Sequence, residues 1–320
     1  MLTGLLCAMG AGLMWGLVFV VPLTLADYPG LLLSFGRYVA FGLIALVPAW
    51  FDRKRIAQLS RADWQAALKL SLIGNLIYYA ALASAIQLAD APLPAVLVGT
   101  LPVVIAACSN FAPSHHADRV SWRRLAPPLL IIFAGLMLVN GSELEHLDGK
   151  HTHAEYALGC LLAGVALAAW TWYPIVNARH LKAHPHIGSS TWATAQGLAT
   201  LPLALAGYTI YCAALARSSA PFALPFGPRP LPFIGLMLTI GLCASWLGTL
   251  LWNRAAKLLP TSLAGQLIVF ETLFALLYAF MLRGSMPPPA VLAGALLLCT
   301  GVMLGMRVFR NAAASTVHEP

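Results

Sequence analysis

A single carboxyl group interrupts one of the most apolar stretches of this chain. Glu271 lies near the middle of GQLIVFETLFALLYAF, residues 265–280. A charge at the centre of a bilayer costs roughly 2.5–3.5 kcal/mol even on insertion-based scales, and acids that persist there mark substrate or proton pathways. Glu271 is therefore the first candidate for function.

Two interpretations of Glu271 stay open. In a water-accessible cavity, the carboxyl group can take up and release a proton as the cavity opens to one side and then the other. This exchange would couple the movement of a solute to a proton gradient. Alternatively, a permanently protonated or ion-paired carboxyl group holds neighbouring helices together through hydrogen bonds.

Arg37 is the basic residue that lies deepest within an apolar stretch. At 1.5 Å per residue it lies roughly 12 Å from the outer end of its helix, and Glu271 lies roughly 16 Å from the outer end of its own. An arginine side chain spans this difference, so the two groups can pair. The alternative is that Arg37 extends towards the outer surface or bonds to backbone carbonyls.

Aromatic and amide side chains supply a candidate lining for a cavity beside these charges. Asn75, Tyr78 and Tyr79 follow i, i+3, i+4 spacing and therefore share one helix face. Aromatic faces suit a cation or a ring and amides suit polar groups, so the lining fits a small zwitterionic or aromatic molecule. The candidate lining residues are Trp15, Asn75, Tyr78, Tyr79, Trp170, Tyr173 and Trp252. The competing interpretation is that these rings anchor or pack helices.

Other motifs offer little chemistry. Pro102 lies near the middle of its segment and is a candidate hinge, because proline removes an N–H and frees a backbone carbonyl. The motifs HExxH, GxSxG, GxxxxGK[ST] and GxGxxG do not occur, so the sequence does not support an enzyme or a nucleotide-driven pump. His146, His151 and His153 lie near several acids and could bind a divalent cation, but polar loops of this length are ordinary. We predict neither a metal site nor a cofactor.

Composition indicates which elements must position these residues. Of 320 residues, 60% are apolar and 9% are charged, against about 25% charged residues in soluble domains. About 20 apolar residues in a helix cross a hydrocarbon core of roughly 30 Å. We expect spans near 4–26, 30–50, 64–87, 92–111, 125–141, 156–178, 189–213, 231–252, 261–282 and 288–307. The sequence thus predicts an all-α integral membrane protein with ten transmembrane helices.

The distribution of Lys and Arg predicts the orientation. With the N-terminus inside, basic residues gather in the cytoplasmic segments 53–61, 119–124, 179–182, 254–257 and 307–310. The outer loops hold Lys150, Arg217, Arg229 and Arg283. This bias places both termini in the cytoplasm. Because it encodes orientation, the net charge of +8 does not point to a nucleic-acid partner.

The sequence also repeats itself. Residues 81–104 align with residues 251–274 without a gap at a constant offset of 170, which sets Pro102 opposite Thr272. Two units of five spans must have opposite orientations because five is odd, and such inverted repeats are typical of secondary transporters. We expect a first unit at 1–141, a periplasmic linker at 142–155, a second unit at 156–308 and a cytoplasmic tail at 309–320.

Short motifs around single polar residues carry a family resemblance. The sequence contains MWGLVFVVP with Trp15, LSFGRY with Arg37, NLIYYAALASA with Tyr79, LWNRAAKLLP with Trp252 and IVFETLFALL with Glu271. In order and spacing, over essentially the whole chain, they resemble the drug/metabolite transporter superfamily of the EamA type. The resemblance implies a bacterial inner-membrane protein with ten helices in two inverted units, a shared central cavity and small-metabolite transport, often export. The chain departs from the family pattern at Thr272, where a proline commonly follows the acid.

The sequence therefore favours a secondary transporter, and we expect an exporter of a small metabolite such as an amino acid, working by alternating access. Proton coupling, and a monomer or a homodimer in the lipid bilayer, stay open. Two other classes compete: a membrane-embedded enzyme acting on a lipid-linked substrate, and a scaffold or sensor. An enzyme would place several acids or histidines at one membrane face, and a scaffold would not need an inverted repeat.

Overall fold

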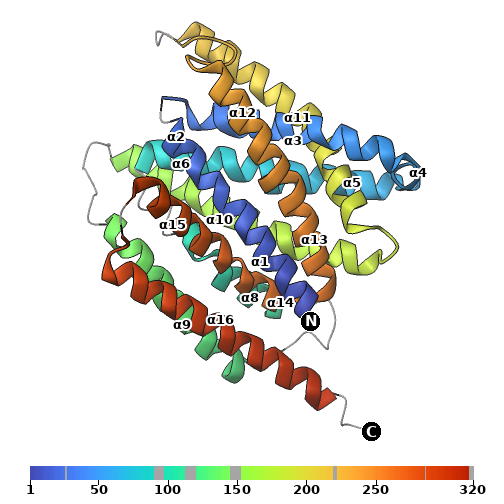
Figure 1. Ribbon diagram of the computed structural model, residues 1–320, viewed down its shortest axis with the longest axis vertical. Helices are drawn as coiled ribbons and strands as arrows, with labels where there is room; N and C mark the ends of the chain where they lie inside the picture. Colours follow the sequence, from blue (N-terminus) through green and yellow to red (C-terminus); the bar gives the residue numbers. More distant parts are fainter. Residues whose placement is uncertain are drawn as a thin grey trace.

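The computed structural model describes residues 1–25, 27–89, 97–111, 120–144, 153–218, 222–284 and 286–316, and these residues form helices and short connections without strands. Figure 1 shows them as one bundle of steeply inclined helices. In the first half the elements are α1 (Leu2–Gly16), η1 (Leu17–Phe19), α2 (Val20–Thr24), α3 (Gly30–Phe51), α4 (Arg53–Ile56), α5 (Arg61–Leu70), η2 (Ser71–Ile77), α6 (Tyr78–Ala89), α8 (Leu101–Phe111) and α9 (Trp122–Leu144). In the second half they are α10 (His153–Ala183), α11 (Ser189–Arg217), α12 (Pro230–Ile240), η4 (Gly241–Leu247), α13 (Gly248–Leu258), α14 (Thr261–Leu267), α15 (Val269–Arg283) and α16 (Pro289–Thr316).

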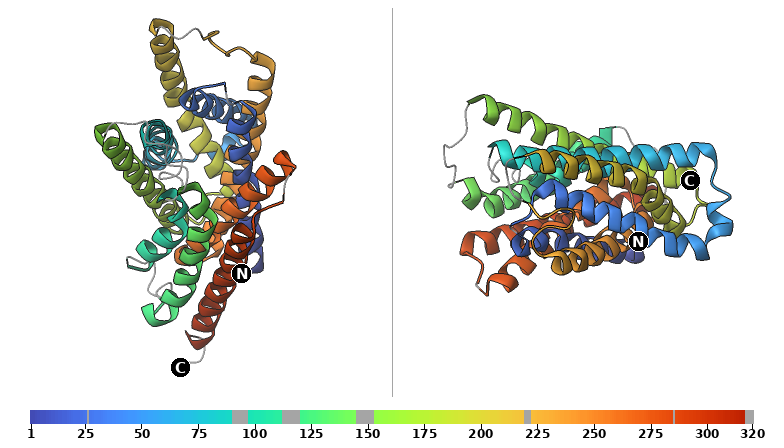
Figure 2. Two further views of the ribbon diagram at one scale, coloured as in Figure 1. Left: turned by 90° about the vertical axis from the view of Figure 1, so that its left-hand side faces the viewer. Right: turned by 90° about the horizontal axis from the view of Figure 1, so that it is seen from above.

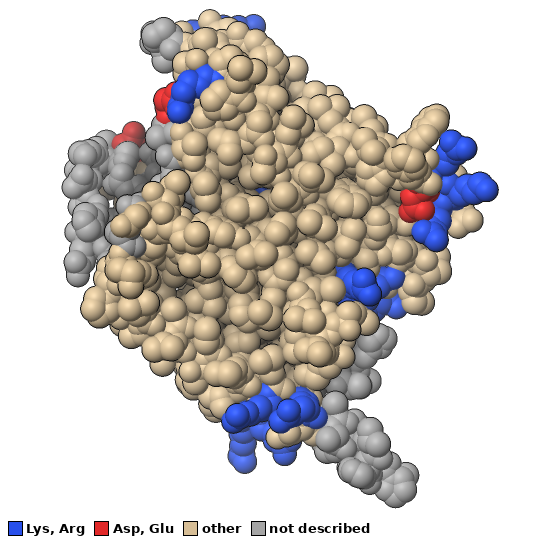
Figure 3. Space-filling model, in the orientation of Figure 1, with Lys and Arg blue, Asp and Glu red and all other residues tan. Residues whose placement is uncertain are grey.

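The surface and the length of the helices fit a bilayer. Seven of the described helical stretches are long and apolar enough to cross a membrane, and Leu2–Gly16 and Leu101–Phe111 are shorter apolar helices. Large apolar side chains stand on the outside, among them Phe51 and Leu231, each 82% exposed. The face in Figure 3 carries its Lys, Arg, Asp and Glu side chains near its rims, and the wide area between them has none. A broad uncharged surface of this kind is stable against lipid and unstable in water.

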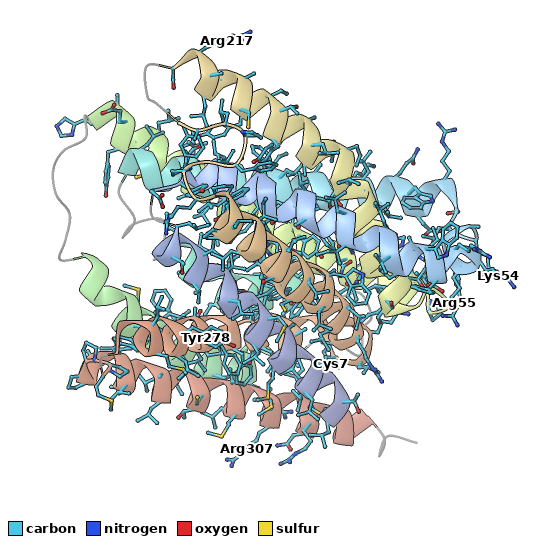
Figure 4. All side chains as sticks on the ribbon, turned by 45° about the horizontal axis from the view of Figure 1, so that its top comes forward. Cys7, Lys54, Arg55, Arg217, Tyr278 and Arg307 are labelled. Atoms are coloured by element: carbon cyan, nitrogen blue, oxygen red, sulfur yellow. The ribbon has the colours of Figure 1, made fainter. Side chains whose placement is uncertain are left out.

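The two ends of the bundle carry different segments of the chain. The N-terminus and the end of α16 lie at the end of the bundle that carries α4, which we call the α4 end (Figures 1 and 2). Figure 4 shows Arg217 at the opposite end from Lys54 and Arg55. The Thr191 hydroxyl donates a hydrogen bond of 2.5 Å to the Asp52 carboxylate and thereby ties the start of α11 to the end of α3 at the α4 end.

Helices of the first half pack against helices of the second half. The main contacts join α9 to α16, α3 to α11, α8 to α14, α10 to α6, and α1 to α13 and α15. The α9–α16 contact is close because Gly135 and Gly294 face each other. A Cβ atom on either glycine would lie 2.8 Å from the backbone oxygen of the other.

Two π-helical segments interrupt the α-helical geometry. The segment η2 runs from Ser71 to Ile77 and η4 from Gly241 to Leu247, so both have seven residues. Their positions differ by 170, which is the offset of the sequence repeat. Single π-turns inside α-helices are rare and occur frequently at functional sites. The sequence analysis did not predict either segment.

The helical segment at 261–283 also breaks, next to the key acid. Ile268 separates α14 from α15, and the Glu271 backbone N–H donates to the Ile268 carbonyl at 2.9 Å. Glu271 therefore lies in the first turn of α15. Pro102 is the second residue of α8, which begins directly after a turn at Thr100. It thus lies at a helix start, where proline fits without loss of a hydrogen bond, and not inside a continuous helix.

The helices extend beyond some of the expected boundaries. The helix α9 ends at Leu144 and α10 begins at His153, so only part of the expected linker 142–155 lies outside a helix or outside the described residues. The helix α16 continues to Thr316, well into the expected tail 309–320.

Candidate functional site

Glu271 lies deep inside the bundle and still keeps part of its surface exposed. The helix α15 crosses α1 closely here, because a Cβ atom on Gly12 would lie 2.9 Å from the Glu271 backbone nitrogen. The charge of Arg37 acts on Glu271 at this depth. The two residues do not form a direct ion pair, so their charges interact only over a longer distance.

Arg37 binds a different partner from those the sequence suggested. Its Nε donates to the Ser245 hydroxyl at 2.9 Å, which joins α3 to the π-helical segment η4. Its guanidinium also stands 5.1 Å from the centre of the Tyr38 ring. The side chain therefore does not use backbone carbonyls, and its charge stays within the bundle. The sequence did not indicate Ser245 as the partner of Arg37, because the two residues come from separate halves of the chain.

The six aromatic residues of the predicted lining form one continuous chain of rings. Trp170 stacks on Tyr78 with 4.7 Å and on Tyr173 with 5.1 Å between ring centres. Trp15 meets Trp170 edge-on at 6.0 Å and Trp252 at 5.3 Å.

Tyr79 completes the chain of rings. It contacts Tyr78 edge-on at 6.4 Å. Tyr78, Tyr79 and Trp170 keep part of their surface exposed, whereas Trp15, Tyr173 and Trp252 are buried. The structure thus brings the predicted residues together from four helices of both halves.

A buried polar network lies beside the rings. The Tyr173 hydroxyl donates to Gln196 Oε1 at 2.8 Å, and Gln196 Nε2 donates to Asn177 Oδ1 at 3.0 Å. Asn177 Oδ1 also accepts from Trp192 Nε1 at 2.8 Å, and its Nδ2 donates to Asn253 Oδ1 at 2.9 Å. These bonds join α10, α11 and α13.

Asn75 is connected to the same network through Thr200 of α11. Its Nδ2 donates to the Thr200 hydroxyl at 3.2 Å, and that hydroxyl donates to the Gln196 carbonyl at 2.7 Å. Ser71 donates to the same carbonyl at 3.1 Å. Asn75 is therefore part of the support of the site. Single polar residues inside spans were the only sequence signal for this network.

Other predicted site residues have separate places. Pro102 is buried in the first turn of α8. It is distant in sequence from the residues of the chain of rings, and no hydrogen bond among the described residues joins it to them. The loop histidines His146 and His151 lie outside the described residues, and His153 is the exposed first residue of α10. The nitrogen Nε1 of Trp252 is buried and has no protein acceptor among the described residues, so it is an unused donor beside the rings.

Comparison with known proteins agrees with this architecture. Residues 2–141 match the EamA-like transporter family. The chain is 50% identical over 307 residues to inner membrane protein YtfF of Escherichia coli strain K12, covering 96% of both chains. It is 22% identical over 298 residues to the uncharacterized transporter YoaV of Bacillus subtilis strain 168, covering 93% of this chain and 94% of the relative.

A solved structure supports the fold independently. A crystal structure with 17% sequence identity matches with a TM-score of 0.72 over 96% of this chain and 98% of its own. That likeness concerns the fold alone. The relatives are described as membrane proteins and transporters, and the described helices are long and apolar enough for a bilayer. The chain belongs to the EamA-like transporter family.

Proposed function

We propose that this membrane transporter is a secondary exporter of a small metabolite, an amino acid or a related compound, that works by alternating access. The observation that carries the proposal is that Arg37 and Glu271 both lie close enough to Tyr78, a member of the chain of rings, to interact with it electrostatically in the interior of the bundle. Opposite charges held apart beside aromatic faces suit a solute that has both an ammonium and a carboxylate group. Arg37 would attract the carboxylate and Glu271 the ammonium group.

Two inverted units are part of this proposal, and the packing supports them. Exchange of the two halves would pair α3 with α11, α8 with α14 and α9 with α16, and these pairs are in contact. The same exchange turns the α1–α13 contact into the α10–α6 contact, and both occur. The segments η2 and η4 stand at the repeat offset. A binding site between inverted units near the midplane is the arrangement used for alternating access.

Burial differs between the two ends of the bundle and suggests which side is closed. In α11 the buried residues fall between Thr191 and Ala204, and in α14 all seven residues are buried. Towards the other end, α15 keeps Glu271 and the residues after it partly exposed. With the α4 end in the cytoplasm, as the positive-inside bias predicts, this describes a carrier that is closed inside and accessible from outside.

Glu271 is the proposed coupling group. A carboxyl group deep in the bundle can exchange its proton with whichever side has access, and binding of a cationic solute group would displace that proton. Entry of protons would then drive export of the solute. Without a nucleotide-binding motif in the sequence, a gradient of protons or of a solute is the available source of energy.

Counterflow in proteoliposomes tests the proposal. We expect that vesicles containing the purified protein, preloaded with unlabelled amino acids and screened against labelled ones, accumulate label transiently. Glu271→Gln is expected to lower the rate at least about tenfold, the scale of one lost charged contact of 1.4 kcal/mol or more. Glu155→Gln, at the exposed start of α10, is the matched control and should behave like the parent.

Two results would contradict the proposal at different levels. A rate that never exceeds that of empty liposomes across a broad panel of metabolites would argue against transport. A rate that is the same at every pH in both the parent and the Glu271→Gln variant would reject proton coupling alone.

A further inference from the structure

Three potential metal ligands meet at the α4 end, away from the chain of rings. Asp63 comes from the first turn of α5, and His180 and His184 come from the last turns of α10. One ligand atom from each residue can be chosen so that all three lie within 4.8 Å of one another. We propose that Asp63, His180 and His184 form a binding site for a divalent transition metal of the zinc class.

One separation between ligand atoms fits a tetrahedral site. Asp63 Oδ1 lies 3.2 Å from His180 Nε2. In a tetrahedral zinc site with ligand bonds of about 2.0–2.1 Å, neighbouring ligand atoms are separated by roughly 3.3–3.5 Å. A carboxylate and two imidazoles leave the fourth position to water or to a solute. The i, i+4 spacing of the two histidines places them on one face of α10.

Each ligand is held in place by a second contact. Ser60 donates to Asp63 Oδ2 from its backbone N–H at 2.8 Å and from its hydroxyl at 2.7 Å, which leaves Oδ1 available. His184 Nδ1 lies 3.0 Å from the His180 carbonyl. A carbonyl can only accept, so Nδ1 carries the proton in this bond and Nε2 keeps a lone pair that can bind a metal. The His180 ring stacks on Trp192 with 4.3 Å between centres. Metal-binding histidines characteristically have such outer partners.

Two of the ligand atoms are buried against each other. Asp63 Oδ1 and His180 Nε2 are both buried and lack a hydrogen-bond partner among the described residues, although they face each other. The side chain of Asp63 is 7% exposed. Buried polar atoms nearly always have a hydrogen-bond partner. A buried polar atom without one calls for an explanation such as a bound ion. A metal between the two atoms satisfies both of them at once.

A metal here would connect two helices and a buried network. The site joins α5 to α10, and Trp192 links it to the buried network through the bond to Asn177. With the α4 end in the cytoplasm, the ion would hold the closed inner side together. The competing interpretation is an ion pair between a protonated His180 and Asp63, which binds no metal. The expectation from the sequence, that the protein has no metal site, would then stand.

Binding to the full-length protein separates the two interpretations. The protein is purified in detergent with a tag that contains no histidine, treated with EDTA, dialysed and titrated with Zn²⁺ by calorimetry. Co²⁺, which gives intense visible absorption in a tetrahedral site, serves as a second probe. We expect one ion per chain. His180→Ala and His184→Ala should each weaken binding at least about tenfold, because loss of an outer partner alone costs 10–100-fold.

Two variants keep the test decisive. Asp63→Asn can still accept the hydrogen bonds of Ser60 that cap α5, so it should fold normally and bind zinc more weakly. His153→Ala, at the opposite end of α10, should bind like the parent. The proposal is overturned if the parent shows no saturable binding. It is also overturned if binding persists in His180→Ala and His184→Ala, or disappears in His153→Ala.

Discussion

The contact between Arg37 and Ser245 joins an interior charge of the first half to the second half of the chain. The Arg37 guanidinium donates across the bundle to a hydroxyl on η4, and Ser245 is 3% exposed. A hydrogen bond to a charged group contributes about 1.5–3 kcal/mol, and an unpaired partner is costly when it is buried. The contact should therefore stabilise the arrangement of the two halves as well as position the charge.

A double-mutant cycle tests this contact. We expect Ser245→Ala and Arg37→Ala each to lower the free energy of unfolding by about 1.5–3 kcal/mol, and the double variant to lower it by clearly less than the sum. The measurement is chemical unfolding in detergent. Thr239→Ala is the control, because this exposed hydroxyl bonds only to the carbonyl of Gly235 in its own helix. Fully additive losses would mean that the two residues do not interact.

Single residues were predictable from sequence where their chemistry conflicts with lipid. Glu271 and Arg37 were found in this way, and helical spacing placed Tyr78 and Tyr79 on one face. Partners that come from distant segments were not predictable, because nothing in one segment encodes which other segment it meets. Ser245 and the network around Asn177 belong to this class. The spacing of His180 and His184 was visible, but the contribution of Asp63 depends on how α5 packs against α10.

At the scale of elements, the π-helical segment η2 depends on a glycine. A Cβ atom on Gly74 would lie 2.3 Å from Cδ2 of Tyr173, the residue that stacks on Trp170. The ring would have to move, and the chain of rings with it.

We therefore expect Gly74→Ala to lower the free energy of unfolding by about 1–3 kcal/mol through overpacking and to reduce counterflow. Gly164→Ala is the matched control, since a Cβ atom there meets nothing within 4 Å. That variant should be neutral or more stable by up to about 1 kcal/mol, because alanine favours the helix. Equal effects of the two substitutions would contradict this role of η2. Thermal unfolding in detergent measures both.

The connection before α3 is tied to the start of α12 by an exposed ion pair. Arg229 Nε donates to the Asp27 carboxylate at 3.1 Å, and the Tyr28 hydroxyl accepts from the Arg229 backbone N–H at 2.8 Å. The hydrogen bond from Arg229 lowers the pKa of Asp27 below its usual value. A lowered pKa in the folded protein means that the pair stabilises the fold at neutral pH and that this contribution disappears as the pH falls through the pKa of Asp27.

The expected pH dependence is small and has a defined sign. The difference in Tm between the parent and Arg229→Gln should be largest at neutral pH and low salt. It should shrink as the pH falls below about 4, where an aspartate in the unfolded chain becomes protonated, and in high salt, which screens exposed pairs. Thermal unfolding over this pH range measures it. A difference that grows on acidification would show that Asp27 is not the partner.

Elements were predictable in position and not in detail. Apolar length alone located most spans, for example α3 at 30–51 against the expected 30–50. The segments η2 and η4 were missed because a π-turn leaves no mark in the apolar pattern and depends on the packing of its neighbours. The break at Ile268 was missed for the same reason, since no proline or glycine stands at that residue. Pro102 was the sequence signal for a break here, and it lies two residues after the turn at Thr100.

At the scale of the whole molecule, the repeat offset of 170 is the feature that sequence and structure express together. Residues 71–77 and 241–247 have diverged in sequence and yet share a π-helical geometry. A geometry that recurs at equivalent positions of two units is expected when both units make the same kind of contact. The segment η2 borders α10 and α11, and η4 borders α1 and α3, which are the corresponding helices under exchange of the halves. The two-unit proposal therefore rests on packing as well as on sequence.

The proposed closed inner side can be tested by the accessibility of two positions on one helical run. Ser71 is fully buried and Tyr79 is partly exposed, two helical turns further from the α4 end. In a variant without the six native cysteines, Tyr79→Cys should react with a membrane-impermeant thiol reagent added outside intact cells. Ser71→Cys, a nearly isosteric change, should not react from either side in inverted and right-side-out vesicles.

The addition of a transported solute turns this comparison into a test of alternating access. A solute that shifts the carrier towards its inward-open form should slow labelling of Tyr79→Cys from outside and speed labelling of Ser71→Cys from inside, since a ligand shifts conformations only by its preference between them. If Ser71→Cys reacts from the cytoplasmic side without solute while Tyr79→Cys is protected from outside, the resting carrier is open inside. Labelling that the solute changes at both positions in the same direction would contradict the exchange of access between the two sides.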